Sequence, residues 1–399
     1  MKAQPALKKN TTDYQAEIAT IHRDISELQG SLAANRIDSE RATKFVYRLY
    51  HRASLTGNPA ELVNVEHAID TAIQRLGAAE DLYLLKANLH FKLHRLAETK
   101  LTLNAIPRLG ASFEGRALLA DIAFQEGKYE LAQNRYRELA DEHPAWDNLA
   151  RLAYLRNKMG DFEEAEKLYI EAEDELTAKE MRSYAWLELQ RGVLHLTRGN
   201  YERARIHYER AGRAYSGYWL VDEHMAELLA AEEKFDEASE LYENLAARAP
   251  KPELQQALAE LYALMGKNEE AQPWAERALA AYLKSAERGE VHYYHHLADF
   301  YAHVREDGAR AATWARKDIE LRENYSTQAA LAWALYLNGE VAEALETIRR
   351  ALSSGVKEAE MYLQAAAIHR AAARAEEGDG YLRTAAEINP HFRNFHVHR

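Results

Sequence analysis

The stretch LADIAFQEGKYELAQNRYRELADEHP, residues 119–144, decides the fold of this 399-residue chain. It holds two apolar segments joined by a turn at Gly127, and alanine, tyrosine and proline follow the turn at set distances. The order recurs in LARLAYLRNKMGDFEEAEKLYIEAE at 149–173 and in LQRGVLHLTRGNYERARIHYERA at 189–211. A period of about 34 residues predicts a stack of helix pairs, because each pair buries its apolar face only on its neighbours.

The recurring residue types have physical reasons. Small residues at positions 8 and 20 let two helices cross closely, and a tyrosine at position 24 fills the gap to the next helix. A glycine at position 15 takes the left-handed conformation that ends the first helix, and a proline at position 32 cannot continue the second. Position 8 is filled by Ala87, Ala120, Ala153, Gly192, Ala226, Ala259, Ala332 and Ala366. Position 24 is Tyr136, Tyr169, Tyr208 and Tyr242, and position 15 is Gly127, Gly160, Gly199, Gly266 and Gly339.

This spacing resembles that of the tetratricopeptide repeat (TPR) family over residues 80–390. Nine repeats start near residues 80, 113, 146, 185, 219, 252, 292, 325 and 359. The copy near 292 has Asp318 at position 27, which leaves its register open to a slip of one residue. The text LAWALYLNGEVAEAL at 331–345, followed by AAEINPHF at 385–392, also looks like a group of bacterial TPR proteins of undefined activity. The resemblance implies an all-α fold, a right-handed superhelical TPR solenoid of about ten helix pairs that completes roughly one superhelical turn.

The two ends of the chain depart from the repeat. Residues 1–79 are interpreted as a polar tail, an amphipathic capping helix at 13–34 and a degenerate helix pair at 39–53 and 60–76. End repeats shield an apolar face, so they are expected to lose the consensus. Residues 80–390 form the predicted solenoid, and residues 391–399 form a histidine-containing C-terminal tail.

Composition narrows the classes of partner. The formal net charge of −12 argues against nucleic acid, whose phosphates attract basic proteins. The chain has no cysteine, so disulfides and thiolate sites are excluded. No run of 18 apolar residues predicts membrane insertion, and the start MKAQPALKKNTTDYQ lacks the apolar segment of a signal peptide. We therefore expect a cytoplasmic protein. The alternative is a periplasmic or secreted protein whose signal peptide was removed.

The sequence contains none of the short motifs that carry catalytic chemistry. HExxH, P-loop, GxSxG and paired Gly-rich patterns are all missing, and no pair of carboxylates stands out with opposed environments. We therefore expect a protein that is not an enzyme and that uses no cofactor.

The resemblance places positions 2, 5, 9 and 12 of each first helix on the concave groove. Carried onto this sequence, nine of these positions are acidic and only one, Arg370, is basic. The acidic groove residues with the strongest case are Glu223, Glu227, Glu253 and Glu260. A cleft lined by one sign of charge focuses its field, so the groove should attract a basic segment.

The same positions hold aromatic residues, the usual anchors of a protein interface. Trp186 is one of them. Tyr293, Phe300, Trp333 and Tyr336 come from two adjacent repeats and form the preferred candidate patch. About half of such rings should instead pack between repeats, since a large ring at a helix junction usually lies in the core.

Histidines supply a second candidate site. His292 and His296 stand four residues apart, a spacing that lets two imidazoles on one helix face chelate a metal ion. The tail adds His391, His396 and His398. The alternative is that these histidines are partly buried or surface residues with no fixed geometry.

Taken together, these features predict a non-catalytic protein-protein interaction scaffold. It would bind a basic or extended protein segment in an acidic, aromatic-bearing groove. Two alternatives stay open: a metal or small-ligand binding protein that uses the histidine-rich C-terminal region, and a non-catalytic subunit of an enzyme complex.

Overall fold

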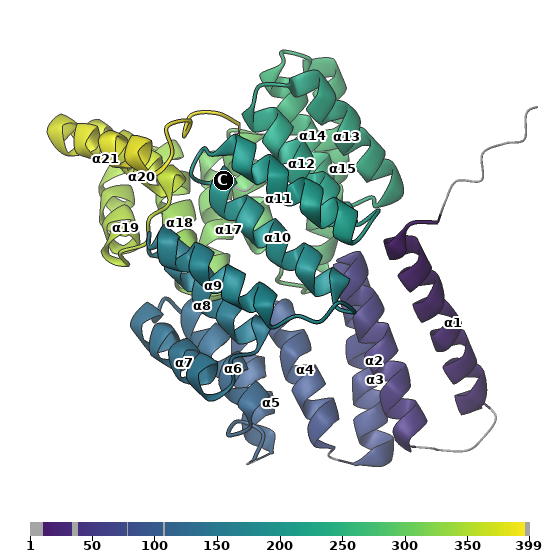
Figure 1. Ribbon diagram of the computed structural model, residues 1–399. Coiled ribbons are helices and arrows are strands. Elements are labelled where there is room, and N and C mark those ends of the chain that lie inside the picture. The colour runs from purple at the N-terminus through teal and green to yellow at the C-terminus, as the bar shows by residue number, and fades with distance from the viewer. Residues whose placement is uncertain (1–10, 34–38, 78, 107, 396–399) are drawn as a thin grey trace, which may run out of the picture.

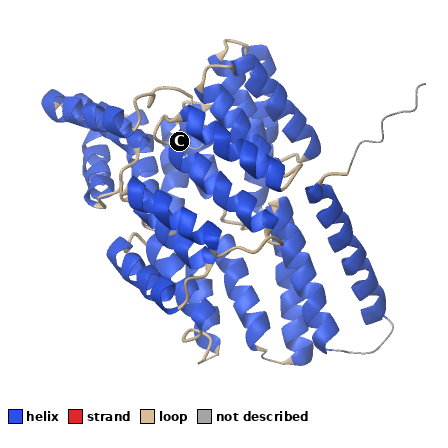
Figure 2. Ribbon diagram, viewed as in Figure 1, coloured by secondary structure: helices blue, strands red, loops and turns tan. Residues whose placement is uncertain are grey.

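The computed structural model describes residues 11–33, 39–77, 79–106 and 108–395. All regular secondary structure within these ranges is helical, as Figure 2 shows. The helices are α1 (Asp13–Ala33), α2 (Ser39–Thr56), α3 (Pro59–Leu76), α4 (Glu80–Lys92), α5 (Leu96–Ala105), α6 (Phe113–Gln125), α7 (Tyr129–Glu142), α8 (Trp146–Lys158), α9 (Phe162–Asp174), α10 (Met181–Leu196), α11 (Tyr201–Ala214), α12 (Trp219–Ala231), α13 (Phe235–Arg248), α14 (Pro252–Leu264), α15 (Asn268–Glu287), α16 (Tyr294–His303), α17 (Gly308–Leu321), α18 (Tyr325–Leu337), α19 (Val341–Ser353), α20 (Ala359–Ala371) and α21 (Ala375–Ile388).

After α1, the helices pack as ten consecutive pairs, from α2 with α3 to α20 with α21 (Figure 1). The predicted all-α solenoid of about ten helix pairs is confirmed. Seven of the nine predicted repeat starts coincide with the first residue of a helix. The other two differ: α10 begins four residues early, at Met181, and α16 begins two residues late, at Tyr294. Among the described residues, no helix is both long enough and apolar enough to cross a lipid bilayer.

The predicted packing positions lie in the core. The alanines at position 8 and the tyrosines at position 24 are all buried. Gly192 shows why position 8 must be small, since a Cβ atom there would lie 2.2 Å from the Tyr208 ring. Position 15 has a positive φ in all nine repeats. Five repeats place glycine there, and four place another residue: His94, Glu233, Glu306 and Ala373.

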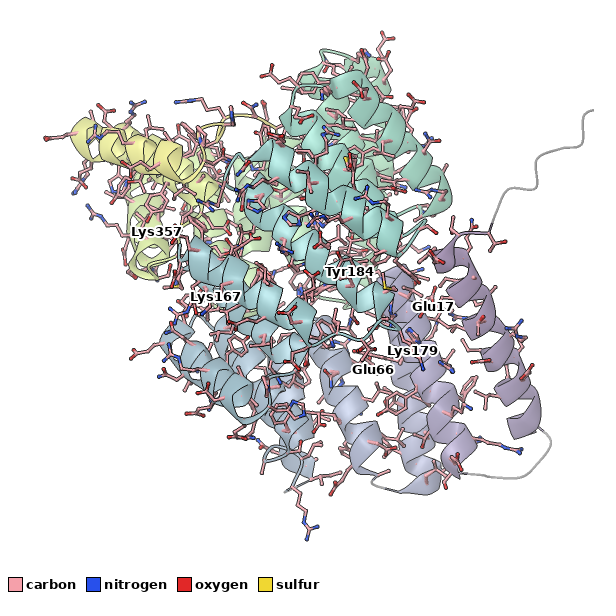
Figure 3. The ribbon with its side chains drawn as sticks, in the orientation of Figure 1. Glu17, Glu66, Lys167, Lys179, Tyr184 and Lys357 are labelled. Carbon is pink, nitrogen blue, oxygen red and sulfur yellow. The ribbon has the colours of Figure 1, made fainter. Side chains whose placement is uncertain are left out.

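Contacts between residues about 200 positions apart join successive turns of the superhelix. Asn324 Nδ2 donates to the Gln125 carbonyl oxygen at 3.0 Å, and the Tyr325 backbone N–H donates to the Tyr129 hydroxyl at 3.0 Å. The Lys357 backbone N–H donates to the Lys158 carbonyl oxygen at 2.8 Å. The α6–α7 pair thus meets the start of the α18–α19 pair, six pairs further on. We call this line of contacts the seam; Lys357, which lies on it, is labelled in Figure 3.

The N-terminal helices also contact helices much further along the chain. The Tyr14 backbone N–H donates to the Ser216 carbonyl oxygen at 3.1 Å, and Trp219 Nε1 donates to the Leu55 carbonyl oxygen at 3.0 Å. Helices α2 and α3 also share one apolar core with α4. With six pairs in a turn, ten pairs make more than the single turn that the sequence predicted, and the turns touch one another.

The chain continues beyond α21 as a short segment, 389–395, that lies against earlier helices. The His391 ring stacks on Tyr201 at 5.0 Å between ring centroids, and Asn394 Nδ2 donates to the Ala231 carbonyl oxygen at 2.8 Å. Phe395 is only 5% exposed, because it packs in the apolar core that α12, α13 and α14 share. The first five residues of the predicted tail are therefore docked; His396 and His398 lie outside the described residues.

Candidate binding surface inside the superhelix

The first helices of several pairs line three adjoining cavities on the inner side of the superhelix. The first, about 330 Å³, lies among α14, α16, α18 and the turn between α4 and α5, and we call it the histidine cavity. The second, about 460 Å³, lies between α14 and α16 and shares His303 with the first. The third, about 160 Å³, lies where α10, α12 and α20 meet the C-terminal segment, and it shares Phe395 with the second.

A polar network joins the walls of the first two cavities. The buried Tyr282 hydroxyl donates to Gln256 Oε1 at 3.0 Å. Gln256 Nε2 in turn donates to Glu260 Oε1 at 2.8 Å and to Asp299 Oδ2 at 2.5 Å. Asp299 Oδ1 lies 3.6 Å from His303 Nε2. One glutamine therefore sets the positions of two carboxylates from α14 and α16, and these acids face the cavities in a fixed arrangement.

The predicted acidic residues divide into two groups. Glu223 and Glu227 are 7% and 2% exposed, so the expectation that they present charge to an open groove is wrong. Glu227 Oε2 lies 3.2 Å from His224 Nδ1, so its carboxylate serves inside the helix stack. Glu253 and Glu260 are partly exposed and line the histidine cavity and the second cavity, respectively. Burial raises the pKa of Glu253, and the nearby Glu223 raises it further.

The predicted aromatic patch also divides. Trp333 and Tyr336 are half-buried and stacked, with centroids 5.0 Å apart and planes at 29°. Trp333 lines the histidine cavity and stacks on His303 at 6.3 Å. Its indole Nε1 is buried without a hydrogen-bond partner in the described structure. These two rings form the accessible part of the patch.

Tyr293 and Phe300 do not belong to an exposed patch. They are 6% and 0% exposed, and both pack against Tyr282. The reason is one extra residue at the end of α16: the Asp307 backbone N–H donates to the Tyr301 carbonyl oxygen, six residues back, where the matching bond after α18, from Glu340 to Leu335, spans five. A slip of one residue rotates a helix position by about 100°. That rotation turns Phe300 into the core. It brings His295, Ala298 and Ala302 to the cavity wall in its place.

Trp186 lies apart from the other predicted site residues. It meets Trp146 edge to face, with centroids 5.9 Å apart, and lines a separate cavity of about 250 Å³ beside Leu55 and Tyr218. The structure therefore does not bring Trp186 together with Trp333.

The predicted metal pair rests on a helix that begins too late to hold it. His292 precedes α16, so His292 and His296 do not share one helix face. Burial lowers the pKa of His292 to about 4. Among the described residues, two groups of three ligand-type side chains have ligand atoms within 4.8 Å of one another. They are His94 with His295 and Asp318, and Glu166 with His195 and His207; neither contains His292 or His296.

Three important residues were missed by sequence reasoning. His94 occupies a turn position and not a groove position, and Asp299 was hidden by the register slip. Phe395 followed a helix-ending Ile-Asn-Pro and was read as part of a tail. An apolar ring seven residues beyond the last helix was the one available signal for docking.

Comparison with protein families finds a model of helical repeats that matches part of the chain. Residues 114–216 match the family model of the TT21 fifth ARM repeats domain. No curated protein sequence matches the chain. A solved structure of a tetratricopeptide repeat protein from Parabacteroides merdae ATCC 43184 is 18% identical, with a TM-score of 0.39; the match covers 73% of this chain and 98% of that one. A solved structure of the APC/C hetero-tetramer Cut9-Hcn1 is 14% identical, with a TM-score of 0.46; the match covers 95% of this chain and 80% of that one. With its ten stacked helix pairs, the chain is an α-helical repeat protein of the solenoid type.

Proposed function

We propose that this protein is a non-catalytic interaction scaffold that binds an extended, basic segment of a partner protein along its inner face. The binding region runs from the C-terminal end of α12, past α14 and α16, to α18. The observation that carries the proposal is intramolecular: the chain's own segment 389–395 already lies on this face as a short peptide.

The docked segment uses the contacts expected of a bound peptide. Asn394 satisfies a carbonyl group at the C-terminal end of α12, and Phe395 fills an apolar site between α12 and α14. An aromatic anchor in a desolvated pocket, flanked by a polar contact, is how peptide ligands gain most of their affinity. A partner segment could extend from this point into the second cavity, which Phe395 also borders.

The electrostatics of the inner face favour a cationic ligand. Glu253, Glu260 and Asp299 come from adjacent helices and line the cavities. Burial raises the pKa of Glu253, so its charged form is poorly solvated there. A lysine or arginine side chain from a partner would stabilise these carboxylates, because an opposite charge within about 4–6 Å favours ionisation.

The stacked rings of Trp333 and Tyr336 supply a second anchoring point at the far end of this region. A cation placed over a tryptophan face gains about 0.5–2 kcal/mol, depending on how far it is desolvated. Trp333 also offers an indole N–H for which the described residues provide no acceptor.

The test uses labelled peptides of about twelve residues that alternate lysine and serine around one phenylalanine. Binding would be followed by fluorescence anisotropy at several salt concentrations, with a glutamate-for-lysine peptide as the control. We expect the basic peptide to bind, its affinity to fall as salt rises, and the acidic peptide to remain unbound.

The matched variants are Glu260→Lys on the inner face and Glu240→Lys on the exposed face of α13. Both change the net charge equally, so a site on the inner face requires a larger loss from Glu260→Lys. Equal losses would place the binding elsewhere. Glu223 and Glu227 are unsuitable for this test, since reversing a buried charge unfolds helices before it reports on binding.

A further inference from the structure

Three potential metal ligands meet where one superhelical turn touches the next. His94 comes from the turn between α4 and α5, His295 from the first turn of α16, and Asp318 from α17. Each offers one ligand atom, and the three atoms lie within 4.8 Å of one another. The two imidazole rings have centroids 5.3 Å apart, and all three residues line the histidine cavity.

Both imidazoles hold an unused nitrogen. The Nδ1 atoms of His94 and His295 are buried and have no hydrogen-bond partner in the described structure. Such an atom costs about 1–3 kcal/mol if nothing binds it. Burial lowers the pKa of both histidines well below the usual value, and the charge of Arg322 lowers it further. Burial thus favours the neutral ring, which is the form that coordinates metal ions.

His94 holds a backbone conformation that the repeat imposes but that glycine would adopt without strain. Its φ is 60°, at the position where five other repeats use glycine. A side chain in the left-handed region costs roughly 1–2 kcal/mol. The other three non-glycine residues at this position, Glu233, Glu306 and Ala373, are exposed to solvent. His94 instead brings its side chain to two other ligand-type side chains, those of His295 and Asp318.

We propose that His94, His295 and Asp318 form a binding site for a divalent transition metal of the zinc class, with water from the cavity as the remaining ligand. Two imidazoles and a carboxylate with one open position suit zinc, which is usually four-coordinate. Tetrahedral zinc ligands lie about 3.3 Å apart, and the three atoms lie within 4.8 Å of one another, so they must close in by at most about 1.5 Å. The cavity gives the side chains room for that movement.

Arg322 is the main positive charge that opposes metal binding at this site. Its Nε and Nη2 atoms lie 3.3 Å and 3.4 Å from the two oxygens of Asp318, which are long ion-pair distances. Arg322 Nη1 also reaches Gln125 at 3.5 Å. In the metal-free form Arg322 neutralises Asp318, and on metal binding it can keep its contact with Gln125. The competition predicts weaker binding than in a site with four protein ligands.

The second cluster carries no comparable argument. Arg191 already lies between its carboxylates, 2.7 Å from Glu166 and 3.1 Å from Glu188. His195 and His207 each lie within 3.0 Å of one of these acids. The cluster is a network of ion pairs inside the stack, and Arg191 already supplies the positive charge that a metal ion would bring.

The experiment titrates zinc and cobalt into tag-free, chelator-treated full-length protein by calorimetry and by the visible absorption of bound cobalt. We expect one ion per chain. The decisive variant is His94→Gly, which installs the residue that five other repeats use at this turn. Because it relieves the positive φ, it should fold as well as the parent protein while binding zinc at least ten-fold more weakly. His295→Gln and Asp318→Asn should show the same loss.

Controls separate this site from other histidines. A variant with His391, His396 and His398 changed to asparagine should still bind one metal ion with the affinity of the parent protein. The same is expected of His67→Gln, which lies on an exposed helix face. Zinc should raise the melting temperature of the parent protein and leave that of His94→Gly unchanged. The proposal is overturned if His94→Gly binds zinc as tightly as the parent, or if binding disappears in the tail variant. Peptide binding plays no part in this measurement, so its failure and that of the proposed scaffold function are distinguishable.

Discussion

Gly127 faces the backbone of Glu323 across the seam, and a Cβ atom on Gly127 would lie 2.8 Å from the Glu323 carbonyl oxygen. Gly160 and Gly199 are in the same situation: a Cβ atom would lie 2.6 Å from the Lys357 side chain and 2.5 Å from Asn389 Oδ1, respectively. Glycine therefore serves two purposes at these turns. It permits a positive φ within the repeat, and it lets the next superhelical turn approach.

The two purposes can be measured separately with Gly127→Ala and Gly339→Ala. Both glycines have a positive φ, 71° and 81°, but the space around Gly339 is open. We expect Gly339→Ala to cost about 1–2 kcal/mol of unfolding free energy from the backbone alone. Gly127→Ala should cost about 1–3 kcal/mol more, because it clashes with main chain that cannot rotate away. Denaturant unfolding measures both, and equal costs would mean that the seam is absent in solution.

The ion pair between Lys158 and Glu358 joins two superhelical turns, and Tyr325 also hydrogen-bonds to Glu358. Lys158→Met leaves a partly buried carboxylate without its cation, so we expect a loss of about 3 kcal/mol in unfolding free energy. Adding Glu358→Gln should restore much of it. A double-mutant cycle by chemical denaturation checks this, and simple additivity of the two losses would contradict the coupling.

Phe300→Ala and Trp333→Ala should have opposite effects. Phe300 is fully buried, so we expect its removal to cost about 3–5 kcal/mol of folding stability. Trp333 is half-buried on a cavity wall, so its removal should leave folding largely intact. It should reduce the binding free energy of the basic peptide by about 2 kcal/mol or more. Thermal unfolding and anisotropy on both variants check this. A large fall in melting temperature for Trp333→Ala with unchanged binding would assign that ring to the core.

Acid should destabilise the protein through Glu66, which is labelled in Figure 3. A hydrogen bond with His90 at 3.1 Å and the charge of Arg95 lower the Glu66 pKa to about 2. The pKa of a glutamate in the unfolded chain is about 4.3. The stabilisation that Glu66 contributes is therefore complete above that pH and is lost as pH falls toward about 2. Glu66→Gln should flatten the dependence of melting temperature on pH in this window. The exposed Glu237→Gln is the control, and an equal flattening by both variants would refute the assignment.

The fold was predictable because the repeat pattern depends on contacts between residues that lie close together in the sequence. The alanines at position 8, the tyrosines at position 24 and the turn glycines each report a contact within one helix pair or between neighbours. The site was less predictable, because it depends on the phase of a single helix. Asp318 marked the irregular repeat, but only the extra residue at the end of α16 explains why Phe300 faces inward.

The seam could not be predicted from the sequence at all. Contacts such as Asn324 with Gln125 join residues 199 positions apart, and no periodic signal connects them. The encounter of His94 with His295 has the same origin. A histidine in place of a turn glycine is a visible departure from the repeat, but its partner depends on how many pairs complete a turn.

The seam also changes how the molecule should respond to force. An open solenoid extends under a small force, since each repeat contacts only its two neighbours. Here each superhelical turn contacts the next through hydrogen bonds and a partly buried ion pair. Pulling the ends apart must first break those lateral bonds, so the force should rise to a yield point before the coils separate. We therefore expect the inner face to keep a fixed width until these contacts between turns break.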